Sequence, residues 1–268
     1  MMTRLWTTLA AIALAPMAHA ADLTFERAFA FAGPSGLAYD ARFCGLWVAN
    51  ETGQVALVNL YGDEIRRFSA DLRRIDAVAM DGGDLLLTNG AGTYQSVTVT
   101  GRALSAPFSI AAGGRDNDGL FVDPLTRDRW ITDDSLSEIV RITADGTFAS
   151  RVEGATLSTP LMEPQGITRD PVTGNLLVVD DADALDALFE FAPDGTLLDV
   201  IPLARGAVAD AEAITIQPET RTVFIGFDDT DTIAVYRYTP TAVGTPAAEP
   251  DPSGCVLSEA AGTLPRRG

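Results

Sequence analysis

Five positions that carry a side-chain oxygen recur along the chain, each directly before a small residue and a short apolar stretch. These positions are Ser35, Asp76, Asp118, Gln165 and Glu212. A second, mostly oxygen-bearing set follows the next apolar stretch in every copy. This set is Asn50-Glu51, Asn89-Gly90, Asp133-Asp134, Asp180-Asp181 and Phe227-Asp228. Carboxylate and amide oxygens are ligands that hard divalent cations prefer, so the two sets indicate cation binding if the fold brings them together.

Closely spaced carboxylates repel one another unless protons or a cation neutralise them. Oxygen ligands without histidine or thiolate select Ca²⁺ or Mg²⁺ over zinc or copper, and Ca²⁺ tolerates the irregular geometry of a ring of loops. We therefore expect Ca²⁺, with Mg²⁺ or Mn²⁺ as alternatives. The expected ligands within the two sets are Asp76, Asp118, Gln165, Asp180 and Glu212. The alternative interpretation is that Asp and Asn simply end strands and form turns.

The composition excludes several common catalytic classes. The only histidine, His19, lies in a segment interpreted below as a signal peptide, and all 19 basic residues are arginine. A mature chain of this kind has no Ser-His-Asp triad, no histidine base and no Schiff-base lysine. The net charge of −18 repels nucleic acid and anionic membrane surfaces and favours cations. We therefore expect no nucleic-acid partner.

The oxygen-bearing positions belong to a repeat that occurs five times in the sequence. Its apolar anchors are Leu37, Val78, Leu120, Ile167 and Ile214, with successive spacings of 41, 42, 47 and 47 residues. A period near forty residues with several strands per copy is typical of a β-propeller, which has one four-stranded sheet per repeat. We predict an all-β propeller with five blades, and six blades as the alternative.

Each copy is predicted to contain strands that follow one another from the centre of the ring to its outside. The innermost strand starts at the apolar anchor. In the second copy the fourth strand is expected over 102–110, whereas the fifth copy lacks a fourth strand altogether. Residues 23–29 resemble the other fourth strands, so we predict that they complete the last blade and close the ring. Because the first two strands of a blade are antiparallel, the residues before the first strand and after the second share one face of the ring.

The ends of the chain are predicted to lie outside the propeller. Residues 1–20 have the positive start, the apolar run and the Ala18-His19-Ala20 cleavage site of a secretory signal peptide. We expect a periplasmic or secreted protein without a membrane span, with its propeller over 21–240 and a tail over 241–268.

The two cysteines, Cys44 and Cys255, are the only ones in the chain. An even pair in an oxidising compartment is expected to form a disulfide, which here would staple the tail to the first repeat. The alternative is two buried free thiols.

One segment resembles a known family. It runs Arg115-Asp116-Asn117-Asp118-Gly119-Leu120-Phe121-Val122-Asp123-Pro124, followed by Arg129-Trp130, and is similar to the Asn-Asp-Gly segment of the senescence marker protein / gluconolactonase family. Residues 163–167 and 178–180 resemble the broader NHL-type repeat. The resemblance implies one divalent cation at the top of the channel, held by Glu, Asn and Asp, that polarises a lactone or ester carbonyl. The matching positions are Asn117, Gln165 where the family has Asn, and Glu212 where it has Asp.

Two functions follow as hypotheses. In the first, the protein hydrolyses small lactones or esters: the cation acts as a Lewis acid, Asp133 or Asp180 accepts a proton from water, and Arg115 steadies an oxyanion or a substrate carboxylate. In the second, a non-catalytic propeller binds a protein, peptide or glycan. Ser35 stands where the family has Glu, and the family has six blades, which favours the second hypothesis. Fold alone does not choose between them.

Overall fold

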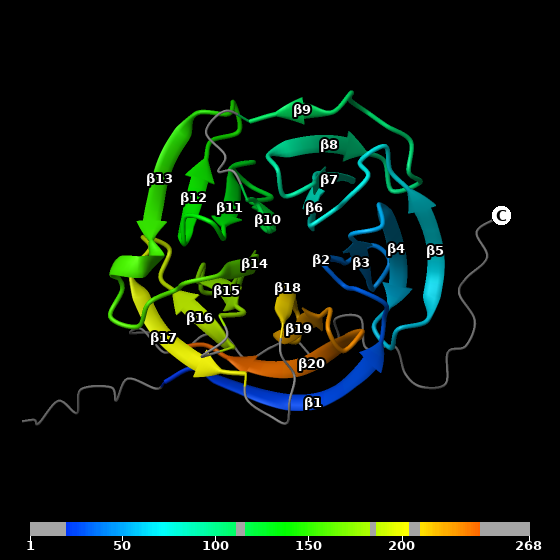
Figure 1. The fold of residues 1–268 in the computed structure, drawn as a ribbon. Coiled ribbons are helices and arrows are strands. Elements are labelled where there is room, and N and C mark those ends of the chain that lie inside the picture. The colour runs from blue at the N-terminus through cyan, green and yellow to red at the C-terminus, as the bar shows by residue number, and fades with distance from the viewer. Residues whose placement is uncertain (1–19, 111–115, 183–185, 204–209, 242–268) are drawn as a thin grey trace, which may run out of the picture.

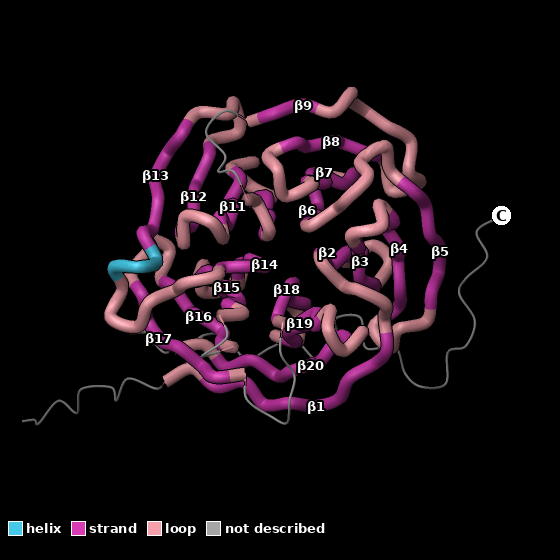
Figure 2. Tube along the Cα trace, viewed as in Figure 1, coloured by secondary structure: helices cyan, strands magenta, loops and turns pink. Residues whose placement is uncertain are grey.

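The structure, a computed structural model, describes residues 20–110, 116–182, 186–203 and 210–241. Within these ranges the chain forms five four-stranded antiparallel sheets arranged in a ring (Figure 1). The protein is therefore a five-bladed β-propeller, as the repeat predicts, and the six-bladed alternative is wrong. The helical structure in the described ranges is one short turn, η1 (Gly154–Thr156), coloured cyan in Figure 2.

Each of the first four blades uses four strands that are consecutive in the sequence. Blade 1 contains β2 (Gly36–Asp40), β3 (Gly45–Asn50), β4 (Gln54–Asn59) and β5 (Glu64–Ser69). Blade 2 contains β6 (Ala77–Asp81), β7 (Asp84–Thr88), β8 (Thr93–Val97) and β9 (Phe108–Ser109). Blade 3 contains β10 (Gly119–Val122), β11 (Arg129–Asp133), β12 (Glu138–Ile142) and β13 (Phe148–Glu153). Blade 4 contains β14 (Pro164–Arg169), β15 (Leu176–Asp180), β16 (Ala187–Phe191) and β17 (Leu197–Pro202).

The fifth blade joins the two ends of the propeller. It contains β18 (Ala211–Gln217), β19 (Thr222–Phe227), β20 (Thr232–Thr239) and, on its outer edge, β1 (Asp22–Ala30). The pairing of β1 with β20 is antiparallel and runs from Asp22 opposite Thr239 to Ala30 opposite Thr232. This confirms the predicted closure by the N-terminal strand, which covers an edge that β20 would otherwise expose (Figure 1).

A buried carboxylate ties blade 4 to the end of blade 5. Glu190 on β16 accepts hydrogen bonds from the Tyr238 hydroxyl and from Asn175 Nδ2, both at 2.6 Å. It also accepts bonds from the backbone N–H and the hydroxyl of Thr241, just beyond β20. Four donors satisfy this acid, so its burial stabilises the joint between the two blades.

The hydrophobic core lies between the blades. Each of the five clusters of buried apolar side chains joins two neighbouring blades, and together the clusters run around the ring. Leu177 and Val179 of blade 4, for example, share a cluster with Ile214 and Ile225 of blade 5. Every blade is therefore covered on both faces, which explains why the strands β3 and β15 are buried along their whole length.

Small residues open the inner strands because neighbouring inner strands approach closely. A Cβ atom on Gly36 would lie 2.8 Å from the Cα atom of Ala77 in the next blade. A Cβ atom on Gly166 would lie 2.6 Å from the backbone nitrogen of Ile214. Any larger side chain at these points would push two blades apart.

The outer edge of blade 2 differs from the expectation. The fourth strand was predicted over 102–110, but β9 covers only Phe108–Ser109 (Figure 2). Pro107, directly before β9, has no backbone N–H to donate to a ladder, and Ala103 makes only an isolated bridge with Val97.

Several predictions fall on residues that the structure does not describe. The signal peptide falls almost wholly in residues 1–19, and the tail from residue 242 onward is likewise outside the described ranges. The expected Cys44–Cys255 disulfide stays a prediction, because Cys255 lies in that tail. Among the described residues, no helix has the length and apolar character needed to cross a bilayer.

Candidate metal centre at the channel mouth

The two oxygen-bearing sets meet at one end of the channel. In blade 4, Pro164 on β14 pairs with Asp180 on β15, and in blade 5, Ala211 on β18 pairs with Phe227 on β19. The start of each inner strand thus lies beside the end of the second strand, as expected from their antiparallel course. We call this end the acidic mouth. It is defined by the carboxylates of Asp76, Asp116, Asp118, Asp134, Asp181, Asp210, Glu212 and Asp228.

One group of three carboxylates comes from blade 3. Asp116 and Asp118 precede β10, and Asp134 follows β11; each offers an oxygen atom within 4.8 Å of the others. The backbone N–H of Asp134 donates to the carbonyl oxygen of Asp116 (3.1 Å), which holds the two loops together. This group can supply three oxygen ligands to one cation.

A second group comes from blades 4 and 5. Asp181, Asp210 and Glu212 offer oxygen atoms within 4.8 Å of one another, and Asp210 also groups with Asp228 and Asp229. Asp210 has a φ of 71°, a left-handed backbone conformation that Asp tolerates better than most residues do. A non-glycine residue in this conformation beside a cluster of charges is typical of a functional site.

Asp76 of blade 2 adds a buried carboxylate to the mouth. Its side chain is only 4% exposed, and its Oδ1 atom accepts a hydrogen bond from Arg74 Nε (2.5 Å). Its Oδ2 atom is buried and has no hydrogen-bond partner among the described residues, and the same is true of Asp118 Oδ2. A Cβ atom on Gly90 would lie 2.7 Å from Asp76 Oδ2 and 3.7 Å from Asp118 Oδ1. Both acids therefore border the small space that Gly90 leaves open.

In the acidic mouth, burial and mutual repulsion disfavour the ionised form of the carboxylic acids. Burial first, and then the charge of Asp181, raise the pKa of Glu212 to about 9. Burial and the charge of Asp116 raise the pKa of Asp118 to about 8, and the same two causes raise the pKa of Asp134 to about 6. Burial raises the pKa of Asp181 to about 7. Without a cation, too little positive charge lies near these carboxylates, so they ionise only at a higher pH than free carboxylic acids do.

Arg74 is the cation that contacts this cluster in the described structure. It bonds Asp76 and forms an ion pair with Glu51 at 2.7 Å. Its own side chain is 58% exposed, so solvent screens its charge. One guanidinium therefore offsets only a small part of the repulsion among the carboxylates of the acidic mouth.

Two of the other expected ligands, Gln165 and Asn117, lie at the same end of the channel. Gln165 is buried, and its Nε2 atom donates to Asp181 Oδ1 at 3.4 Å. Asn117 is completely buried between Asp116 and Asp118, and its backbone N–H donates to the carbonyl oxygen of Gly90 (2.6 Å).

The expected proton acceptors, Asp133 and Asp180, serve the loops. Asp133 Oδ1 accepts hydrogen bonds from the Ser135 hydroxyl (2.9 Å) and the backbone N–H of Leu136 (3.0 Å). Asp180 Oδ2 accepts a bond from the backbone N–H of Met162 (2.7 Å), and its Oδ1 atom accepts one from Ala182 (2.9 Å). These bonds give both acids a structural use, and their catalytic use stays a prediction.

The remaining two positions contribute differently. The Ser35 hydroxyl donates to the backbone carbonyl oxygen of Ile75 (2.7 Å), which links blades 1 and 2. Ser35 therefore brings no carboxylate to the mouth, and the acid of blade 1 at this end is Glu51, after β3, which pairs with Arg74. Arg115 lies outside the described residues, so its expected contact with an oxyanion stays a prediction.

Six acids of these groups were not among the expected ligands: Asp116 and Asp210, together with Asp134, Asp181, Asp228 and Asp229. The first two stand two positions before Asp118 and Glu212, and Glu163 stands two positions before Gln165 in the same way. Side chains alternate along extended backbone, so residues two apart point the same way. The spacing of two residues could therefore have identified Asp116 and Asp210 as further candidate ligands.

Comparison with known proteins supports the fold. No protein-family model matches the chain, and no curated protein matches it. Among solved structures, a glutaminyl cyclase from Myxococcus xanthus superposes with a TM-score of 0.64 at 13% identity, covering 82% of this chain and 97% of that one. A chain of a mitotic checkpoint complex superposes with a TM-score of 0.56 at 10% identity, covering 88% and 98%.

A third neighbour, the WD40 β-propeller domain of Doa1, has a TM-score of 0.51 at 11% identity and covers 75% of this chain and 77% of that one. At such low identities these similarities establish the propeller fold and nothing finer. They do not name the gluconolactonase family, so that resemblance stays a prediction.

Proposed function

We propose that the protein binds a hard divalent cation at the acidic mouth, with Ca²⁺ as the first candidate and Mg²⁺ or Mn²⁺ as alternatives. The observation that carries the proposal is the pair of buried carboxylate oxygens, Asp76 Oδ2 and Asp118 Oδ2, without partners among the described residues. A buried, unpaired carboxylate oxygen is costly. A cation bordered by both acids removes that cost.

The donor set fits such an ion. Two groups at the mouth each offer three oxygens to an ion: Asp116, Asp118 and Asp134 form the first, and Asp181, Asp210 and Glu212 form the second. The charge of Asp118 also raises the pKa of Glu212, which indicates that the two groups act on each other. Ca²⁺ takes roughly six to eight oxygens at flexible geometry, whereas zinc prefers histidine or cysteine.

The test is a thermal melt of chelator-treated protein as Ca²⁺, Mg²⁺ or Mn²⁺ is restored. Binding to the folded state raises the melting temperature with ion concentration. Asp118→Asn is expected to abolish most of this rise, while the control Glu153→Gln, an exposed acid on β13, is expected to keep it. An unchanged melting temperature with every ion would overturn the proposal.

A second candidate function is hydrolysis of small lactones or esters at the same mouth. It is favoured by Asp134, whose pKa is raised to about 6, because a general base works best when its pKa lies near the working pH. When bound, a cation supplies Lewis acidity toward a carbonyl oxygen. Asp134 would accept a proton from the attacking water. Its side chain is partly exposed, so a substrate can reach it.

A substrate panel tests this candidate. Lactones and esters are assayed with wild type and with Asp134→Asn, and a peptide with N-terminal glutamine is included because one structural neighbour is a glutaminyl cyclase. Because Asp134 is also a proposed ligand, the assay is run at an ion concentration that restores the ion-dependent rise in melting temperature of Asp134→Asn. Turnover that is still lost in Asp134→Asn under these conditions supports hydrolysis. Equal turnover in the two proteins would exclude Asp134 as the base.

The non-catalytic alternative is binding of a protein, peptide or glycan at the mouth. One structural neighbour belongs to a mitotic checkpoint complex, which is an assembly of proteins. An ion-dependent melt without turnover of any panel compound favours this alternative over hydrolysis.

A further inference from the structure

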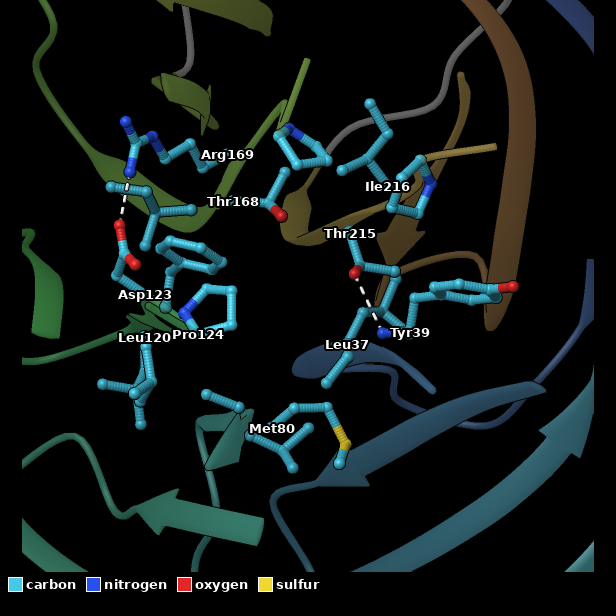
Figure 3. A pocket seen from close by; sticks show the side chains of 18 of the residues that line it. Leu37, Tyr39, Met80, Leu120, Asp123, Pro124, Thr168, Arg169, Thr215 and Ile216 are labelled. Atoms are coloured by element: carbon cyan, nitrogen blue, oxygen red, sulfur yellow. Dashed lines mark hydrogen bonds and ion pairs between the residues drawn. The ribbon is translucent and has the colours of Figure 1, made fainter. Parts of the chain in front are cut away.

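A second cavity lies at the end of the channel away from the acidic mouth. It has a volume of about 470 Å³ and is lined by the later residues of the inner strands and by the turns that follow them. Pro124 and Leu125 of blade 3, Pro171 of blade 4 and Pro218 of blade 5 form part of its rim. We call this cavity the apolar funnel. Figure 3 shows its lining side chains.

The apolar funnel is separated from the acidic mouth. Between them the channel narrows to a space of about 10 Å³, bordered by the small residues and apolar anchors of all five inner strands, among them Gly36, Leu37, Ala213 and Ile214. A cavity needs about 10–15 Å³ of this volume to hold a single water molecule. A ligand at one end therefore does not reach the other.

The chemistry of the funnel is mainly apolar. Leu37, Met80, Leu120 and Ile216 line it, and no other blade matches the aromatic Phe121 of blade 3, because the equivalent positions hold Ala or Thr. Phe121 also packs against the apolar cluster between blades 3 and 4. The hydroxyl oxygen of Thr168 points into the opening in Figure 3, whereas the Thr215 hydroxyl in the same lining accepts a bond from the backbone N–H of Tyr39 (3.0 Å).

Ion pairs between blades hold the rim in place. Arg169 of blade 4 pairs with Asp123 of blade 3, and Arg127 of blade 3 pairs with Asp81 of blade 2. Asp123 also accepts backbone N–H bonds from the turn that forms the rim, at 2.8 Å from Leu125. The two charged residues that line the funnel, Asp123 and Arg169, are therefore matched to each other.

We propose that the apolar funnel binds an uncharged, mainly apolar small molecule that carries one hydrogen-bonding group. The cavity falls within the roughly 300–1,000 Å³ of small-molecule sites. It is about three times the ~150 Å³ cavity that takes one benzene, so the ligand is about two or three fused or linked rings in size. Thr168 pairs with the polar group of that molecule.

The first test uses the neutral fluorophore N-phenyl-1-naphthylamine with the full-length protein. Its emission is expected to rise on binding, and Met80→Glu, which puts a charge into the funnel wall, is expected to weaken binding at least tenfold. Leu104→Glu is the matched control, because Leu104 is an exposed apolar residue of the same blade (44% exposed). Circular dichroism and melting confirm that both variants are folded.

The second test measures the polar contact. Wild type is expected to bind 2-naphthol about three- to tenfold more tightly than naphthalene, because one hydrogen bond contributes roughly 1 kcal/mol. Thr168→Val keeps the shape and removes the hydroxyl, so it is expected to abolish that preference and leave naphthalene binding unchanged. Chelator is expected to change none of these values, which separates this site from the acidic mouth.

Two results would overturn the proposal. One is N-phenyl-1-naphthylamine binding that is absent from wild type or equally strong in Met80→Glu. The other is a naphthol preference that persists in Thr168→Val.

Discussion

At the scale of single residues, acids in this protein serve two opposite purposes. Asp123 and Asp170 end inner strands, and their carboxylates accept hydrogen bonds from the following turn at 2.8–2.9 Å. Asp118, at the start of an inner strand, has a buried oxygen without such a donor among the described residues. The first kind stabilises a turn and the second kind destabilises the folded protein unless an ion joins it. Residue type alone does not distinguish them.

Glu212→Gln is expected to raise the melting temperature of the chelator-treated protein near pH 7. Glu212 is ionised in the unfolded chain but has a pKa of about 9 in the folded protein, so folding forces it to take up a proton. A neutral amide removes this cost. The same variant is expected to lose most of the stabilisation by added ion, because it removes a ligand.

Differential scanning calorimetry with and without Ca²⁺ measures both effects. Glu153→Gln on β13 serves as the control, with no change expected in either. A Glu212→Gln protein that melts lower than wild type in chelator would contradict the assignment of Glu212 as a strained acid.

At the scale of strands, the position of each inner strand is set by a small residue at or near its start. Gly36, Ala77, Gly119, Gly166 and Ala213 occupy equivalent places, and each is small. The close approach of neighbouring strands explains this choice and fixes the width of the channel. The apolar anchors that follow then fill the narrow part between the acidic mouth and the apolar funnel.

Gly166→Ala is expected to destabilise the protein by about 1–3 kcal/mol, the usual cost of overpacking. The added Cβ atom would lie 2.6 Å from the backbone nitrogen of Ile214, which cannot rotate away. Gly83→Ala is the control, because the nearest atom there is Arg42 Nη1 at 3.2 Å, the end of a flexible side chain. Urea unfolding measures both, and equal midpoints would show that the inner strands can move apart.

At the scale of the whole molecule, the channel has two chemically different ends. Carboxylates from blades 2 to 5 gather at one end, and apolar side chains with a neutral rim gather at the other. Part of the net charge of −18 is therefore placed at the end proposed for the cation. A propeller permits this because the strands of every blade run from one end of the channel to the other, so every blade contributes loops to both ends.

The stability of ion-free protein is expected to fall as pH rises from about 5 to about 9. Over this window the unfolded chain has ionised carboxylates, whereas folded Glu212 and Asp118 keep their protons until pKa values of about 9 and 8. The folded state binds more protons, so the free energy of unfolding decreases with pH.

A bound ion replaces those protons, so stabilisation by Ca²⁺ is expected to grow across the same window. Melting temperatures at several pH values, with chelator or with Ca²⁺, measure both trends. An ion-free melting temperature that rises between pH 5 and 9 would contradict the raised pKa values.

Much of this organisation could be predicted from the sequence. The spacing of Leu37, Val78, Leu120, Ile167 and Ile214 predicted five blades because each blade repeats the same burial pattern. The missing fourth strand of the last copy predicted closure by residues 23–29. Both features are encoded in local patterns of apolar residues.

The groupings at the two ends could not be predicted in the same way. Whether Asp118 meets Asp134 or Asp76 depends on distances between loops, and no periodicity encodes those distances. The apolar funnel combines the later residues of inner strands and the turns of several blades, a combination that is visible only once the blades are placed around a common axis.

The pairing of β1 with β20 has a consequence for the synthesis of the chain. The first strand to be synthesised finds its only edge partner in the last one, roughly two hundred residues later. Because β20 comes last in the sequence among the described strands, the ring can close only after the chain has been made through residue 239. A chain that stops short of residue 232 leaves both edges bare, and such exposed edges invite pairing with another copy. The order of the strands thus makes closure of the ring depend on a complete fifth blade.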